Sequence, residues 1–305
     1  MSALSRIAFR LAILAFPAVA AAAPLAAQAG LDTVQIRTLP LGKGVYLLMG
    51  SGGNMALSVG SDAALLVDDQ FAPLSARILA AVKAVTDKPV RFVVNTHWHG
   101  DHVGGNENLA ATGAVIVAHD NVRTRMSVEH FNELLNSRTP ASPPAALPVV
   151  TFSETVAFHL NGEEIHVVHV PPAHTDGDAI IHFSAANVLH LGDVYFNGRY
   201  PFIDLSSGGS FEGVINAVNA GLRYVNDSTK VIPGHGALAT RADLVAYRDV
   251  LVKIRDRVAA LIKQGKTKEQ VVAAKPSAEW DAAWGTGFMK PDVFLGVVYD
   301  SMKRK

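Results

Sequence analysis

Two hydrophobic periodicities alternate along the chain after residue 30. Short runs rich in apolar and β-branched residues predict strands, and stretches with helical spacing of apolar residues separate several of these runs. The predicted strands are Gln35–Leu39, Val45–Leu48, Ala63–Val67, Arg91–Asn95, Val115–Ala118, Ile165–Val170, Ala179–Phe183, Val188–Leu191 and Lys230–Ile232. This mixture of strands and helices is typical of an α/β protein.

Three helix starts are predicted near the C-terminus. Each begins at a threonine whose side chain can cap the first turn, or at a proline that favours the first helical position. They are Thr240, with Asp243 three residues later, Thr267, with Gln270 three residues later, and Pro291. The segment from about residue 240 to 305 is therefore expected to be helical. A further helix is expected between Pro73 and Pro89, and a loop over Arg138–Pro148.

The first 29 residues predict a cleaved export signal. Arg6 and Arg10 precede an uncharged stretch, Leu11–Ala29, which ends in the small-x-small pattern of a signal-peptidase site. A membrane anchor is the alternative, because this stretch approaches the roughly 20 residues that span a bilayer. Two internal prolines and the cleavage pattern favour the signal. We therefore expect a periplasmic or secreted protein, exported by the general route, that has no membrane association after cleavage.

Composition narrows the classes of function. The 305-residue chain has 27 basic and 27 acidic side chains, and this balance argues against a nucleic-acid-binding protein. The chain has no cysteine, which excludes disulfides, thiolate metal sites and cysteine nucleophiles. Any metal site must therefore use its 12 histidines and its carboxylates. One domain, residues 30–305, is expected to follow the signal.

Four candidate metal ligands follow the strand predicted at Arg91–Asn95. His97 and His99 lie two positions apart, so on extended backbone their side chains point to the same face. Asp101 and His102 follow in a glycine-flanked turn that allows them to approach that face. Four such residues so close together at the end of a strand indicate a metal site.

Three further candidate ligands have the same kind of placement. His174, Asp193 and His235 each follow another predicted strand, and each lies near a glycine. Ligands on loops at one end of a sheet are a common way for a rigid scaffold to present a functional site. The sequence therefore offers seven residues for one centre.

Together with Asp68, these seven residues resemble in order the five motifs of the metallo-β-lactamase superfamily. The resemblance spans roughly residues 35 to 240. It implies an αββα sandwich, in which two mixed β-sheets face each other, helices cover the outer faces and the metal site lies at one edge. The predicted strands and helices are compatible with this fold but do not select it by themselves.

The resemblance also implies a role for each of these residues. It places two zinc ions in each chain, the first on His97, His99 and His174 and the second on Asp101, His102 and His235, with Asp193 bridging them. A hydroxide shared by the two ions would attack the substrate, and Asp101 would act as the catalytic residue that orients it and carries its proton. Asp68 would hold a ligand or its loop. Iron or manganese is an alternative at the carboxylate-rich second site.

The absence of cysteine bears on the activity that the resemblance implies. In cysteine-containing lactamases of the superfamily, a cysteine binds the second metal at the position of Asp193, whereas a ligand set with aspartate is similar to glyoxalase II and lactonases. We expect an exported dinuclear zinc hydrolase that opens an amide or ester-like carbonyl. β-Lactam hydrolysis is preferred, because β-lactams are met outside the cytoplasm. A lactonase or a thioesterase similar to glyoxalase II is the alternative, and a non-catalytic metal-binding protein would be expected to have lost ligands.

The residues that contact a small-molecule substrate have weaker signals. Arg199 and Asn197 are the candidates for contacting substrate. Arg199 could bind a substrate carboxylate, and the alternative is a surface arginine stacked on Tyr200. Gly50–Asn54 is either a mobile hairpin over the site or a plain turn. Seven histidines are expected to be structural or on the surface: His119, His130, His159, His166, His169, His182 and His190. The sequence leaves the oligomeric state open.

Overall fold

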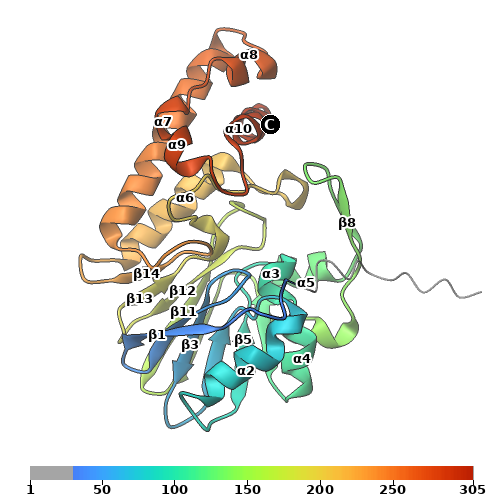
Figure 1. The fold of residues 1–305 in the computed structure, drawn as a ribbon, viewed down its shortest axis with the longest axis vertical. Helices are drawn as coiled ribbons and strands as arrows, with labels where there is room; N and C mark the ends of the chain where they lie inside the picture. The colour runs from blue at the N-terminus through green and yellow to red at the C-terminus, as the bar shows by residue number, and fades with distance from the viewer. Residues whose placement is uncertain (1–29, 305) are drawn as a thin grey trace, which may run out of the picture.

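Two β-sheets pack face to face in the computed structural model, which describes residues 30–304 (Figure 1). The predicted export signal lies outside these described residues. The first sheet contains, in spatial order, β1 (Arg37–Gly42), β2 (Val45–Met49), β3 (Met55–Val59), β4 (Ala64–Val67), β5 (Val90–Val94), β6 (Val115–His119) and β9 (Val150–Phe152). The second contains β10 (Thr155–Leu160), β11 (Glu163–His169), β12 (Ala179–Phe183), β13 (Val188–His190) and β14 (Lys230–Ile232). A separate hairpin is formed by β7 (His130–Asn132) and β8 (Ser137–Thr139).

Helices cover both outer faces of the sandwich. On the first sheet and its edge lie α2 (Ser75–Lys83), α3 (Gly100–Val103), α4 (Asn106–Ala111) and α5 (Asp120–Met126). On the second sheet lie α6 (Phe211–Gly221) and the C-terminal helices α7 (Arg241–Lys263), α8 (Lys268–Ala273), α9 (Ala278–Trp284) and α10 (Pro291–Lys303). Helices begin at the three positions predicted near the C-terminus, and both threonines form capping boxes.

Successive apolar side chains of a strand point alternately into the space between the sheets and toward the outer helices, which gives the sandwich its separate hydrophobic cores. In β2, Leu47 packs between the two sheets, whereas Leu48 packs on the outer face against the side of α2 and α4. In the second sheet, Val188 faces the space between the sheets and Leu189 faces α6 and the C-terminal helices. Successive residues of a strand point to opposite faces, so one strand contributes to two cores. The αββα sandwich expected from the resemblance is confirmed.

The strand directions bring five loops to one end of the sandwich. β4 and β5 are parallel, as are β13 and β14, and β11 runs in the direction of β13 because both are antiparallel to β12. A hydrogen bond from the Ala179 amide to the Thr96 carbonyl, 2.8 Å long, joins the two sheets at this end. The residues that follow β4, β5, β11, β13 and β14 therefore converge.

Several elements differ from those predicted from the sequence. β3, β9, β10, the β7–β8 hairpin, α6 and α9 were not expected, and the predicted loop Arg138–Pro148 includes the end of β8 and a short 3-10 turn at Pro144–Ala146. Among residues 30–304, no helix has both the length and the apolar character needed to cross a lipid bilayer.

Phe294 of α10 provides a test of how the C-terminal helices are joined to the sandwich. Its fully buried ring stacks on Tyr200 at 4.4 Å and meets the edge of Phe211 at 5.9 Å. We expect Phe294→Ala to lower the free energy of unfolding by about 3–5 kcal/mol, because it removes a buried aromatic ring and leaves a cavity. Urea unfolding followed by circular dichroism measures this change.

The neighbouring exposed residue is the matched control for that variant. Val293 is 43% exposed, and we expect Val293→Ala to change stability by less than about 0.5 kcal/mol. Both variants should unfold in one transition. A separate early transition of the C-terminal helices in Phe294→Ala would contradict the expectation of a single domain.

Candidate metal centre

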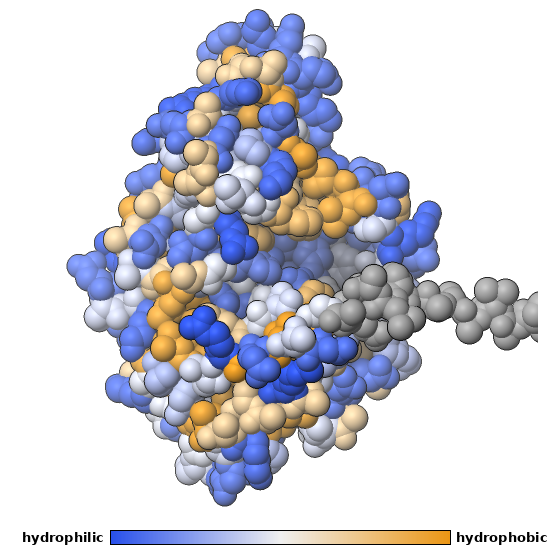
Figure 2. Space-filling view, viewed as in Figure 1, coloured by the Kyte–Doolittle hydropathy of each residue, from blue (hydrophilic) through white to orange (hydrophobic). Residues whose placement is uncertain are grey.

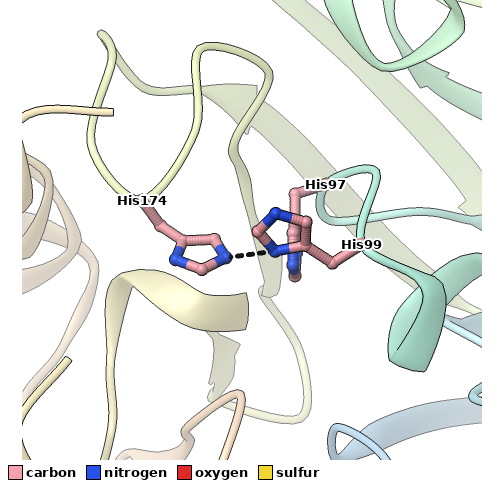
Figure 3. Close-up of side chains that lie close together, drawn as sticks. All are labelled: His97, His99 and His174. Atoms are coloured by element: carbon pink, nitrogen blue, oxygen red, sulfur yellow. Dashed lines mark hydrogen bonds between the residues drawn. The ribbon is translucent and has the colours of Figure 1, made fainter. Parts of the chain in front are cut away.

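The structure brings all seven predicted ligands together at the loop end of the sandwich. His97 and His99 follow β5, Asp101 and His102 lie in α3, and the other three follow strands of the second sheet: His174 after β11, Asp193 after β13 and His235 after β14. Three groups have ligand atoms within 4.8 Å of one another: His97, His99 and His174; His97, His102 and Asp193; and Asp101, His102 and His235. In Figure 3, His174 approaches His97 and His99 from the opposite side of the site.

Hydrogen bonds outside the cluster set the protonation of His99 and His174. His99 Nε2 lies 3.0 Å from a carboxylate oxygen of Asp204, and His174 Nδ1 lies 2.7 Å from the carbonyl of Phe202. Both partners are acceptors, so each ring donates its proton there. The remaining nitrogens, His99 Nδ1 and His174 Nε2, lie 2.8 Å apart, the contact that the dashed line in Figure 3 marks. With both protons donated outward, these two nitrogens are free to bind a cation. Burial also lowers the pKa of His174, to about 4, which keeps this imidazole neutral.

Asp68 and Thr96 set the protonation of the other two imidazoles. His102 Nδ1 donates to Asp68 Oδ2 at 2.7 Å, so Nε2 is the nitrogen that faces the centre. Burial lowers the pKa of His102, but Asp193, Asp101 and Asp68 outweigh it and raise this pKa well above its usual range, so a bound cation would take the place of the proton on Nε2. The Thr96 hydroxyl donates to Asp68 and therefore accepts from His97 Nδ1 at 3.0 Å, which leaves His97 Nε2 as a lone pair. Asp68 has an unusual left-handed backbone, φ 59°, and also accepts from the Thr96 amide. The structure thus places Asp68 behind the cluster, in contact with one predicted ligand.

Asp193 lies in the middle of the imidazole nitrogens. One of its carboxylate oxygens is 3.1 Å from His102 Nε2, and the other is 3.4 Å from His235 Nε2 and 3.5 Å from His174 Nε2. Burial opposes its ionisation, but the surrounding imidazoles of His235, His102 and His174 hold the pKa of Asp193 well below its usual range. An ionised, buried carboxylate surrounded by imidazole nitrogens is an arrangement that a cation would stabilise.

Asp101 and His235 form the more open side of the cluster. Asp101 Oδ2 lies 3.2 Å from His235 Nε2, and the Asp101 side chain is 27% exposed. Burial raises the pKa of Asp101, but His102 and His235 outweigh it and bring the pKa to about 2. For His235, burial is outweighed by Asp193 and Asp101, which raise its pKa to about 9. Asp101 is therefore an ionised group next to solvent.

Unpartnered buried atoms provide a test of whether a metal fits these residues. His97 Nε2, His102 Nε2 and Asp193 Oδ1 are buried without a hydrogen-bond partner. A buried polar atom without a partner is costly, and these three point into one cluster. Neutral imidazole and carboxylate are the donors that zinc takes in cysteine-free sites. The residues present therefore fit divalent metal ions.

Two supporting residues carried no recognisable signal in the sequence. Asp204 accepts from His99 Nε2 and also from the hydroxyl of Ser207 at 2.6 Å. Asp178 accepts from the amides of His174 and Thr175 and so fixes the turn that carries His174. Asp204 lies 105 residues from its ligand in the chain, and only its position as the cap of a short turn marks it in the sequence.

The segment Gly50–Asn54 is a turn fastened to the site. The Gly53 amide donates to the Asp101 carbonyl at 3.1 Å, and a β-carbon at Gly53 would lie 2.1 Å from Cε1 of His102. The side-chain amide of Asn54 donates to the carbonyls of Pro233 and Gly236, both at 2.9 Å, while its backbone amide donates to Gly234 at 2.7 Å. The segment connects the antiparallel strands β2 and β3 and packs against His102 and the His235 loop.

A cavity of about 440 Å³ opens above the centre. Its floor includes His99, Asp101, Asp193 and His235, and Arg199 lies on its wall. Tyr200 is buried and stacks on Phe294, so the alternative of an arginine lying on an exposed Tyr200 ring has no support among the described contacts. Asn197 donates to the Ala237 carbonyl at 3.0 Å and is not among the residues that line this cavity.

The other histidines lie outside the three ligand groups found among residues 30–304. His190 is buried between the Gly192 amide and the Asn54 carbonyl, His119 stacks on His169 at 3.7 Å, and His130 contacts Ser207. His166 and His182 face each other as a cross-strand pair. These contacts are structural.

Known proteins share both the sequence pattern and the fold. The family model described as the metallo-beta-lactamase superfamily matches residues 50–253. A hydroxyacylglutathione hydrolase of Haemophilus influenzae is 28% identical over 155 residues, which cover 50% of this chain and 72% of that enzyme. The structure of a stereoselective inverting sec-alkylsulfatase from Pseudomonas sp. superposes with a TM-score of 0.67 at 16% sequence identity. The match covers 88% of this chain and 50% of the sulfatase chain. The structure of a metallo-beta-lactamase from Pontibacter korlensis superposes with a TM-score of 0.59 at 18% sequence identity. The match covers 71% of this chain and 99% of the lactamase chain.

Replacing Asp68 by asparagine tests how this residue supports the cluster. Asparagine tolerates the left-handed backbone, but an amide nitrogen at Oδ2 would face the N–H of His102 and favour the tautomer with the proton on Nε2. We expect Asp68→Asn to lower the affinity for zinc about 10- to 100-fold, measured by competition with a chelator.

Asp62→Asn is the control, because Asp62 is exposed and caps the Asn161 turn away from the cluster. Equal zinc affinity in Asp68→Asn and Asp62→Asn would contradict a role for Asp68 in setting the tautomer of His102.

Proposed function

The chain belongs to the metallo-beta-lactamase superfamily, and from this premise we propose that it is an exported dinuclear zinc hydrolase that opens an amide or ester-like carbonyl. One observation carries the proposal: the inward-facing atoms of His97, His102 and Asp193 are buried without partners, and Asp193 also lines an open cavity. A protein that only folded around these residues would leave that desolvation uncompensated. The predicted signal in residues 1–29 supports export to the periplasm or the medium.

The chain's own residues divide the work of such a reaction. His97, His99 and His174 would hold one zinc ion, Asp101, His102 and His235 the other, and Asp193 would lie between them. When bound, zinc supplies Lewis acidity for the carbonyl and lowers the pKa of water to about 7.

Asp101 is the group placed to handle protons. Its carboxylate is ionised, partly exposed and on the cavity floor, so it can accept a hydrogen bond from the attacking water and pass the proton to the leaving group. Asp68 and Asp204 keep their histidines oriented with lone pairs inward.

β-Lactams are the substrates that we propose first. Their strained amide is the bond that this centre would cleave, and their carboxylate is a suitable partner for the guanidinium of Arg199 on the cavity wall. A thioesterase or lactonase is the second candidate, and the similarity to a hydroxyacylglutathione hydrolase favours it. The presence of all seven ligands disfavours a non-catalytic metal-binding role.

A substrate panel tests the proposed reaction. Mature protein, with its zinc, iron and manganese measured, is assayed against penicillins, cephalosporins, carbapenems, acyl-homoserine lactones and a glutathione thioester. We expect turnover of at least one class by the zinc-loaded protein and a loss of at least about 100-fold in kcat for Asp101→Asn. Absence of turnover for every class would refute the hydrolase in this form.

Metal stoichiometry tests the proposed place of Asp193. We expect Asp193→Ala to lower the zinc content from about two to about one per chain, because one carboxylate is removed from between both ion positions. Metal analysis after dialysis measures this change. Unchanged stoichiometry in a folded variant would refute a bridging role for Asp193.

A further inference from the structure

Two apolar side chains stand exposed at the mouth of the cavity above the centre. Leu135, in the turn of the β7–β8 hairpin, is 46% exposed, and Phe288, in the loop between α9 and α10, is 64% exposed. They lie 153 positions apart in the chain (288 − 135), yet both line the same cavity. Figure 2 shows hydrophobic surface beside a hollow between the helical part of the molecule and the sandwich. Large apolar groups gathered at a cavity mouth are typical of ligand binding.

Contacts hold both segments in place. The hairpin is joined to the 204–207 turn by His130, whose Nε2 lies 3.2 Å from the Ser207 hydroxyl, and by the Glu133 amide, which donates to Ser206 at 3.2 Å. Phe288 meets the edge of the Phe202 ring at 5.7 Å. These contacts join the hairpin and the α9–α10 loop to residues 202–207, beside the cavity.

The rest of the cavity wall is mostly apolar. Beyond the ligands on the floor, its apolar lining includes Phe71, Trp98, Phe196, Phe202 and Met289. Arg199 is the one cation among the lining residues other than histidine. Its aliphatic stem lies against Gly287, next to Phe288. An exposed guanidinium on the wall of a mostly apolar cavity is suited to an anionic ligand.

We propose that Leu135 and Phe288 form an apolar clamp for a large hydrophobic substituent of the substrate, while Arg199 binds an anionic group of the same molecule. The substrate class is therefore an amphiphilic anion, whose scissile bond lies over the centre. This inference rests on the proposed function for the bond that is cleaved. The volume of about 440 Å³ is sufficient for a drug-sized molecule. Leu135 lies within residues 50–253 of the family match, and Phe288 lies beyond them.

Two fluorescent probes test the clamp without any hydrolysis. The first, 8-anilinonaphthalene-1-sulfonate, combines aromatic rings with an anion, and N-phenyl-1-naphthylamine has the same rings without the sulfonate. We expect Arg199→Gln to weaken binding of the sulfonate about tenfold and binding of the neutral probe less than about twofold. We expect Leu135→Ala and Phe288→Ala to weaken both probes about three- to tenfold.

Leu134→Ala is the matched control for the hairpin. Leu134 is the neighbouring residue and is 42% exposed, but it lines a different groove beside α8 and α10. We expect this variant to bind both probes as the wild type does. Equal weakening by Leu134→Ala and Leu135→Ala would place the probes in that other groove and overturn the proposal, as would equal sensitivity of the two probes to Arg199→Gln.

Kinetics separates the clamp from the chemistry. For hydrolysed substrates with an apolar substituent, Phe288→Ala should raise KM about three- to tenfold with little change in kcat, because the lost contact acts on ground state and transition state alike. Intact probe selectivity without any hydrolysis would refute the proposed function and leave the clamp standing. Hydrolysis that does not depend on Leu135 or Phe288, with unselective probe binding, would refute the clamp alone.

Discussion

The buried carboxylate of Asp68 is the group on which the candidate centre depends. It is fully buried, so its oxygens require hydrogen-bond donors to offset their desolvation. The amide and hydroxyl of Thr96 and the Nδ1–H of His102 supply them. These bonds fix the exit of β5 against the exit of the parallel strand β4, and they turn His102 Nε2 toward Asp193. One side chain therefore couples the register of two strands to the orientation of His102, one of the candidate metal ligands.

How much of the centre could be predicted from the sequence depends on how far apart its residues lie along the chain. His97 to His102 lie within six positions, so their spacing alone indicates a metal site. His174, Asp193 and His235 required the positions of strand ends together with the superfamily resemblance. Asp204 could not be found in this way, because its contact with His99 crosses 105 residues and no local pattern pairs them. The cavity walls could not be predicted either, because the β7–β8 hairpin and the α9–α10 loop are far apart in the sequence and line one cavity only in the folded chain.

The fold shows why some elements escaped prediction. α6 contains Gly213 and Gly221, and glycine lowers helix propensity by about 1 kcal/mol. A β-carbon at Gly213 would lie 1.7 Å from the Pro172 carbonyl, so glycine is required where α6 packs on the loop that carries His174. The residue that weakens the local helix signal thus permits a tertiary contact beside the centre. β10 was missed for another reason: it is a partly exposed edge strand and lacks the continuous apolar run of the buried strands.

The hydrogen bonds of Asn54 have a consequence for folding. They join the start of β3 in the first sheet to the Pro233–Gly236 loop of the second, across about 180 residues of chain. The candidate ligands of the two sheets lie close together only when the sheets are joined by contacts such as these hydrogen bonds. Contacts between such distant segments pay the largest loop-closure entropy and form slowly. The complete set of ligands therefore requires closure of the chain across about 180 residues, and an ion bound by ligands from both sheets would stabilise the closed sandwich against unfolding.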